Sequence, residues 1–366
     1  MNARRPLPVV RPVSLPVAAL ALALALALPF APRSAAHAAL EWSLDADRVE
    51  VGSVHIESLR IEATGDGAVD AKFDGVTLPG PGAWGTLAAR CAAGPVRCER
   101  GTVQRVAEDG RILADGEFQR GPDTLTLVDG EGRLRWGLAT GALQAQAWPL
   151  PGWLTGAGSA ISVQDGRLDG RMDRDADSLR VEGSVRSLAF DTPDGRYAGA
   201  DLDLTGRAQL TDGRLHGRLS WTAGEALLGP AYLPPPEHPV HVEGVLEPAG
   251  AEEQVLRLHI DVDPNGEDAI RAALEARIAA LADAPALIGA SLNLDTVDLA
   301  RAWSLGAESL AARVGWPGLQ IAGQLSGSLD WRPEHALEAD LAWQNVAIDD
   351  PAGRVGVKGC RGGWSS

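Results

Sequence analysis

The chain of 366 residues is short of basic side chains. Lys and Arg number 33 against 49 Asp and Glu, which gives a formal net charge of −16. A protein that binds nucleic acid by neutralising phosphates needs a basic face, and anionic lipid headgroups would not attract a surface of this charge. The composition therefore argues against nucleic acid as a partner and against charge-driven binding to anionic membranes.

Long hydrophobic runs are also scarce. The longest apolar stretch, 17–31, has about 15 residues, whereas a helix that spans a bilayer needs about 20. It follows three arginines and precedes Ala36-His37-Ala38, an arrangement typical of a secretory signal peptide. We expect residues 1–38 to direct Sec-type export to the periplasm and to be cleaved off. The alternative is an uncleaved leader that anchors the protein in the inner membrane.

Cysteine is rare, with three in the chain. Cys91 and Cys98 enclose a Gly-Pro turn signal, and two short strands folding back there would bring the sulfurs within bonding reach. Because export permits disulfides, we expect a Cys91–Cys98 disulfide. The spacing is not that of paired zinc ligands. Cys360 would then have no partner.

Motifs that carry catalysis or cofactor binding are missing as well. The chain has no G-x-S-x-G, no H-E-x-x-H and no P-loop. Residues 80–85 match G-x-G-x-x-G by letter, but no helix is expected to follow them, so we interpret the segment as a loop. The sequence indicates a protein that is not an enzyme and binds no cofactor.

Two segments resemble metal sites in part. Residues 261–266 open like a calcium loop, yet position twelve is Ala272 instead of Glu, and a solvated turn is the better interpretation. Glu237, His238 and His241 have a metal-like spacing, but imidazoles three residues apart in a strand point to opposite faces. We therefore predict no metal site.

The dominant feature that is present is the alternation of apolar and polar residues, which indicates strands with one buried face. Residues 200–210 and 215–221 both alternate, and Asp212-Gly213 between them suits a tight hairpin turn. Similar units recur along the chain. We predict a mainly β protein, a long antiparallel meander of about 15 to 18 strands curled into an elongated groove.

The same patterns suggest how the chain is divided. We expect an N-terminal groove half over 39–232, a Pro-rich linker at 233–239, and a C-terminal half over 240–366, which stops within a strand pattern as a truncated chain would. One short helix is predicted over 298–314, because Asp298 can cap it and Gly315 ends it. Residues 269–281 fit a helix or a strand, and the turn signal before them favours the strand.

A sheet that is apolar on one face must cover that face. Two sheets could pack together, the sheet could close into a barrel, or it could form a trough lined for acyl chains. With 5% aromatic residues and one expected helix there is little filler, which favours the trough. The candidate lining residues are Leu202, Leu204, Leu215, Leu219, Leu258, Ile260, Leu319, Ile321, Leu325 and Leu329.

Two stretches carry a resemblance to a known family. Gly318 to Trp331 (GLQIAGQLSGSLDW), after the Asp298 helix and before Leu341 to Arg354, resembles the AsmA-like proteins, especially the TamB and YdbH branches, and 161–210 looks like the same repeat. The resemblance implies a repeating β-groove that carries phospholipids between the inner and outer membranes, with an inner- or outer-membrane protein as a further partner. Family members are generally longer and have an N-terminal transmembrane helix.

Other functions stay open at this point. A structural or assembly scaffold of the cell envelope, similar to the N protein of type II secretion, would use the same sheet with its apolar face packed by protein and an edge strand for a partner. An extracytoplasmic hydrolase or carbohydrate-binding protein would need Asp and Trp together in a cleft. Binding of phospholipid or another acyl-chain lipid is the preferred hypothesis.

Overall fold

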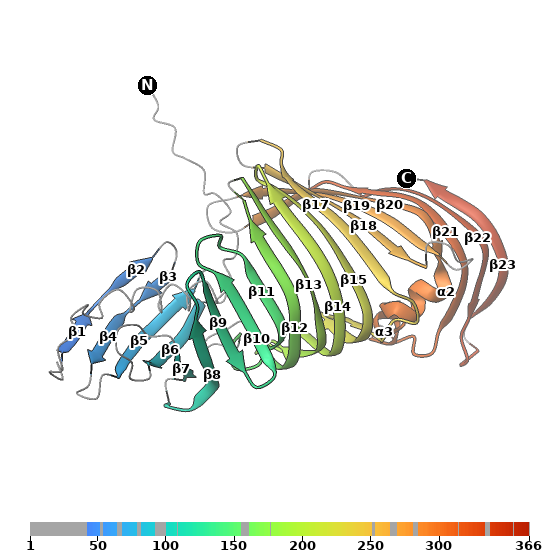
Figure 1. The fold of residues 1–366 in the computed structure, drawn as a ribbon. Coiled ribbons are helices and arrows are strands. Elements are labelled where there is room, and N and C mark those ends of the chain that lie inside the picture. The colour runs from blue at the N-terminus through green and yellow to red at the C-terminus, as the bar shows by residue number, and fades with distance from the viewer. Residues whose placement is uncertain are drawn as a thin grey trace, which may run out of the picture. The chain divides into compact units, whose positions relative to one another are not determined.

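The computed structural model describes residues 42–365, with gaps at 52–53, 64–67, 79–81, 92–99, 108, 155–160, 176, 251–252, 264–268, 281–284, 314, 334–336 and 354. The expected leader, 1–38, lies outside the described residues. The described chain is mainly β, with its strands in a long open antiparallel sheet and one short helical segment (Figure 1). This confirms the predicted fold class.

The chain forms two compact units, and the boundary between them runs through β13 (Ser178–Asp191). Of the described residues, the N-terminal unit comprises those up to Arg174 together with Leu188–Pro193, and the C-terminal unit comprises Asp175–Ser187 and those from Asp194 on. The expected linker, 233–239, falls inside the C-terminal unit. There β15 pairs directly with β17, the strand that follows the Pro-rich stretch.

The N-terminal unit is built from short strands in an antiparallel meander. Its strands are β1 (Trp42–Ala46), β2 (Val49–Val51), β3 (Val54–Ile56), β4 (Ser58–Ala63), β5 (Val69–Leu78), β6 (Gly82–Cys91), β7 (Arg100–Val106), β8 (Ile112–Arg120), β9 (Thr124–Asp129), β10 (Gly132–Gly137), β11 (Leu143–Pro149) and β12 (Ser162–Arg174).

The apolar face of this unit is filled by its own side chains. Phe73, Leu87 and Leu127 are among its fully buried residues, and seventeen buried residues form one core. The turn after β11 adds Trp153, whose indole Nε1 donates to Asp129 Oδ2 at 2.7 Å and whose ring lies 5.4 Å from that of Trp148. Within this unit the sheet therefore has a packed core.

The C-terminal unit has longer strands. After β13 they are β14 (Tyr197–Thr211), β15 (Arg214–Leu228), β16 (Ala231–Leu233), β17 (Val240–Pro248), β18 (Glu253–Val262), β19 (Ile270–Ala280), β20 (Pro285–Asp298), β21 (Gln320–Trp331), β22 (Glu338–Asp349) and β23 (Gly356–Ser365). Between β20 and β21 lie α2 (Leu299–Ala302), the π-helical turn η1 (Trp303–Ala307) and α3 (Glu308–Arg313). We call these three elements the helical strap.

Several local expectations are confirmed. The segment predicted at 269–281 contains the strand β19 (Ile270–Ala280). The helix predicted over 298–314 is present as the strap, and the Asp298 carboxylate accepts from the backbone N–H of Arg301 at 2.8 Å, as an N-cap does. The strap is kinked at Gly306, which has non-helical backbone angles.

Two expectations are corrected. The strand labels run to β23, beyond the expected 15 to 18. Three of the strands, β2, β3 and β16, have only three residues each and are too short for alternation to reveal. The segment interpreted as a loop, 80–85, has its last residues, from Gly82, in the strand β6. Glycine and alanine do not distinguish a buried face from an exposed one, so the alternation of residues did not predict a strand there.

Candidate functional site: the apolar face of the C-terminal unit

The strands of the C-terminal unit share one register, which the hairpin turns set. Asp212 and Gly213 both have positive φ angles, 50° and 76°, as a two-residue turn that matches the strand twist requires. The pairing Leu210 with Leu215 follows directly from that turn. Because side chains of paired residues lie on the same face, the pairing along β14 to β23 places apolar residues in rows that run across the strands.

Four such rows cross the sheet, and we name them A to D. Row A contains Leu204, Trp221, Val240, Val262, Ile270, Val297, Leu325 and Trp343, and row B contains Gly206, Leu219, Val242, Ile260, Ala272, Leu294, Gly327, Leu341 and Trp364. Row C contains Ala208, Gly217, Gly244, Leu258, Leu274, Leu292, Leu329 and Ala339, and row D contains Leu210, Leu215, Leu246, Leu256, Ala276, Ala290 and Trp331.

The opposite face of the same strands is polar and held by ion pairs. Glu243 on β17 accepts from Arg218 Nη2 at 2.5 Å and is hydrogen-bonded to His216 Nε2 at 3.0 Å. These contacts, with that from Arg218 the larger, lower the pKa of the Glu243 carboxyl. Arg257 on β18 likewise bridges Glu247 and Glu275 on the two neighbouring strands. These charged side chains make the face suitable for contact with solvent.

The helical strap covers only part of the apolar face. Val262, Ile270 and Val297 of row A are 2%, 8% and 6% exposed, and Ala302 and Leu305 of the strap pack against them. In rows B and D, by contrast, Leu219 and Leu215 are 43% and 40% exposed, and Trp364 is 52% exposed. Each half-exposed leucine forgoes roughly 1 kcal/mol of burial free energy. The uncovered rows therefore form a large apolar surface in contact with water.

Seven of the predicted lining residues lie in these rows. They are Leu204 and Leu325 in row A, Leu219 and Ile260 in row B, Leu258 and Leu329 in row C, and Leu215 in row D. The other three lie past row A, toward the strap. Leu202 is buried, Ile321 pairs with Ile348, and Leu319 precedes β21 with its carbonyl accepting from Trp303 Nε1.

Sequence reasoning missed the residues on which the strap packs and the position of Cys360 on the apolar face. Val262, Ile270 and Val297 were not among the candidates, although pairing outward from the Asp212-Gly213 turn would have assigned them to row A. Cys360 on β23 pairs with Val346 and lies on the apolar face. Cys360 is a free cysteine and Cys91 is disulfide-bonded. Cys98, the expected partner of Cys91, lies outside the described residues.

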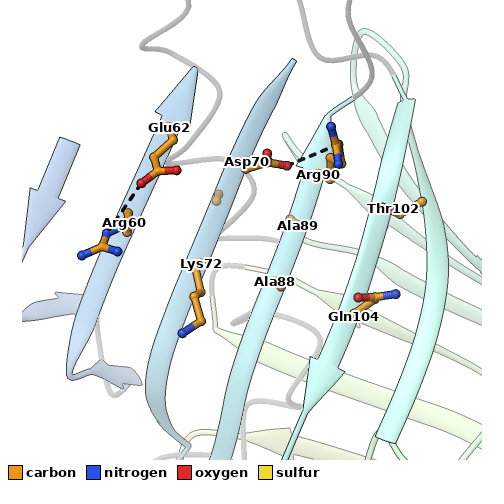
Figure 2. Close-up of a pocket in the computed structure, with 10 residues that line it drawn as sticks. Arg60, Glu62, Asp70, Lys72, Ala88, Ala89, Arg90, Thr102 and Gln104 are labelled. Atoms are coloured by element: carbon orange, nitrogen blue, oxygen red, sulfur yellow. Dashed lines mark ion pairs between the residues drawn. The ribbon is translucent and has the colours of Figure 1, made fainter. Parts of the chain in front are cut away.

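The N-terminal unit has a polar pocket of about 520 Å³ on the outer face of β4 to β7. Figure 2 shows its charged side chains standing on this face. The register forms two rows across the strands: Arg60, Lys72, Ala88 and Gln104, and Glu62, Asp70, Arg90 and Thr102. The small Ala88 between longer side chains makes the depression.

The charges of this pocket are balanced. Arg60 lies 3.9 Å from Glu62 and 2.8 Å from Asp45, and Arg90 lies 3.5 Å from Asp70 (Figure 2). Lys72 is paired with Asp74 at 3.0 Å. More than half of each cationic side chain is exposed. An incoming anion would have to compete with these carboxylates, so the pocket is a weaker candidate site than the apolar face.

The described residues also bear on a metal site and on a membrane-spanning helix. The described part of the chain contains no group of three or more His, Cys, Asp or Glu placed to hold a metal ion. His241 is instead hydrogen-bonded through Nδ1 to Ser220 Oγ at 2.7 Å on the polar face. None of the helices in the described ranges is both long and apolar enough to cross a bilayer.

Comparison with known proteins adds no assignment to this geometry. The chain matches no protein-family model, and searches of curated proteins and of solved structures found no significant match.

Proposed function

We propose that the C-terminal unit binds the acyl chains of phospholipids or of similar long-chain lipids, and that the protein handles such lipids in the periplasm between the inner and outer membranes. The observation that carries this proposal is the uncovered part of rows B to D. It is an apolar surface of aliphatic side chains whose reverse face is ion-paired and water-soluble.

The dimensions of the surface suit lipid chains. Neighbouring strands are about 4.8 Å apart and alternate residues about 6.8 Å apart, so rows A to D on β14 to β23 cover roughly 40 Å by 20 Å of sheet. An acyl chain in one bilayer leaflet is about 15 Å deep, half of a 30 Å hydrocarbon core. Every methylene moved from water onto the surface contributes about 0.8 kcal/mol. Binding would also cover the exposed leucines.

The two units contribute differently to this function. In the N-terminal unit the apolar face is already filled by its own core, so we assign it no ligand. The net charge of −16 favours neutral or zwitterionic headgroups over anionic ones. Export to the periplasm is the expectation from the leader.

The test is analysis of lipid retained by the purified protein, with mass spectrometry as the readout. Leu219→Asp places a charge in row B at a position that is already 43% exposed, so the fold should survive while lipid is lost. Thr205→Asp is the matched control, because it adds the same charge to the exposed polar face of the neighbouring strand β14.

We expect phospholipid in the wild type and in Thr205→Asp and a loss of at least about tenfold in Leu219→Asp, since a carboxylate under an acyl chain costs about 1.4 kcal/mol or more. Circular dichroism and thermal melting check the fold of each variant. Wild-type protein that carries no lipid, takes up none from vesicles, and instead co-purifies with a stoichiometric protein would refute the proposal in favour of the scaffold.

A further inference from the structure

The two edges of the apolar face are built differently. We call the strand ends beside row A the helix edge and those beside row D the hairpin edge. At the helix edge the chain makes long excursions, one through β16 and the Pro-rich stretch and one through the helical strap. At the hairpin edge, Asp212-Gly213 alone joins β14 to β15. Figure 1 shows α2 and α3 lying at one end of the long strands.

The strap is fastened on both sides. Arg301 Nη1 donates to Asp263 Oδ2 at 3.3 Å, and only 13% of the Arg301 side chain is exposed. Trp303 Nε1 donates to the Leu319 carbonyl at 2.6 Å, just before β21. On the other side Gly306 packs so closely on β16 that an added Cβ would lie 2.8 Å from Leu233 Cδ2. The strap is therefore held in place on both sides, against β16 at one side and just before β21 at the other.

The hairpin edge is open and apolar in the part that the structure describes. Leu215 at the start of β15, Leu287 near the start of β20 and Trp331 at the end of β21 are 40%, 48% and 37% exposed. Leu337, immediately before β22, is 52% exposed. Exposed apolar side chains at the boundary of a larger apolar surface are typical of a place where a ligand or membrane is met. The helix edge also exposes Tyr197, Leu228 and Tyr232, at 46%, 47% and 39%, so the two edges differ by the strap and not by exposed side chains alone.

We infer that acyl chains reach rows B to D across the hairpin edge, with the helix edge closed to them by the strap. This inference rests on the proposed function and adds to it the direction of loading. A chain that enters beside Leu215 keeps contact with apolar atoms throughout, while its headgroup stays in water outside the edge. At the opposite end the same chain would meet the packed residues Ala302 and Leu305.

Strand β15 offers a matched pair of variants for the test. Leu215 and Leu228 stand at its two ends and are exposed to similar extents, 40% and 47%. Vesicles of zwitterionic phosphatidylcholine with brominated acyl chains serve as the probe, because bromine quenches tryptophan on contact. Trp221, Trp331 and Trp343 lie on the apolar face and report arrival of the chains.

The expected result is that Leu215→Asp slows quenching about tenfold, because the chain must pass a carboxylate, and also lowers its final extent, because Leu215 belongs to row D. Leu228→Asp should load at the wild-type rate. Leu337→Asp, outside the strands and outside rows A to D, is the second hairpin-edge variant and should slow loading as Leu215→Asp does, while the final extent of quenching stays near that of the wild type.

Equal rates in the two β15 variants, or slowing by Leu228→Asp instead, would overturn the loading direction while leaving the lipid function intact. A lower final extent at an unchanged rate in Leu337→Asp would do the same. If the wild type shows no quenching, the proposed function fails, and the loading direction fails with it.

Discussion

The buried guanidinium of Arg105 on β7 donates a hydrogen bond from Nη1 to the backbone carbonyl of Gly152, in the turn after β11. Arg105 is 0% exposed, and its neighbours in the sheet are Leu87 on β6 and Ala114 on β8. Burial lowers the pKa of Arg105 to about 10. The charged Arg105 side chain therefore links the turn that contains Trp153 to the sheet from a position inside the apolar core.

Two substitutions at this position should have different effects. Arg105→Met keeps most of the side-chain volume and removes the buried charge, so its unfolding free energy should stay within about 1 kcal/mol of the wild type or rise. Arg105→Ala leaves a cavity and should lower the unfolding free energy by about 2 to 4 kcal/mol. Urea denaturation measures both values. Equal destabilisation by the two variants would show that the charge itself holds the unit together.

Cys360 gives a second, label-based test of the apolar face. Its thiol lies on this face of β23, in register with Val346, and is free and partly exposed. It lies past row A, on the side of the helix edge, so a lipid chain confined to rows B to D should leave it accessible to a water-soluble maleimide, and saturation with phosphatidylcholine should leave the modification rate unchanged. Mass spectrometry follows the adduct. The control is the same reaction in urea, where the rate should rise because the thiol is then fully exposed. Slowing by lipid in the folded protein would place an acyl chain at the helix edge and contradict the loading direction.

The Glu243 ion pairs predict a pH dependence of stability. Because hydrogen bonds from Arg218 and then His216 lower the pKa of Glu243 in the folded state, the unfolded chain takes up this proton first as the pH falls. The stabilisation is therefore complete above the ordinary glutamate pKa of 4.5 and is lost as the pH falls through the lowered value.

Glu243→Gln should remove this contribution. Its urea midpoint should fall slightly below that of the wild type at neutral pH, and the two midpoints should converge as the pH falls below the lowered pKa of Glu243. The effect should be small because Glu243, Arg218 and His216 are each more than a third exposed. Glu253→Gln, at the exposed start of β18, is the control. A difference from the wild type that does not change with pH would exclude the carboxylate as its source.

Much of the fold could be predicted because local chemistry determines it. Asp212-Gly213 has the positive φ angles that a two-residue hairpin turn needs, and Asp298 caps a helix in the structure as its position in the sequence suggested. Alternation located the strands that are long enough to show it. These features depend on neighbouring residues, so the sequence alone carries them.

The remaining features of the fold depend on which elements cover each face of the sheet. The alternation of apolar and polar residues does not show which elements these are. Leu134 in the N-terminal unit and Leu219 in the C-terminal unit both alternate with polar neighbours, yet one is 2% exposed and the other 43%. The difference comes from residues distant in the sequence, such as Trp153, which fills one unit. The buried position of Arg105 could not be predicted for a related reason. Alternation assigns charged side chains to the solvent-exposed face of a strand, so it places Arg105 on that face. Its spacing of two from the buried Val103 was the available signal.

The repeated register also determines how such a surface can be resized. Seven strands, β14, β15 and β17 to β21, each present the same four inward positions, so a two-strand hairpin is an interchangeable module that spans about 10 Å across the strands. Inserting or deleting one module would lengthen or shorten the lining while its cross-section stayed constant. The capacity of the protein for cargo would then scale with its number of hairpins.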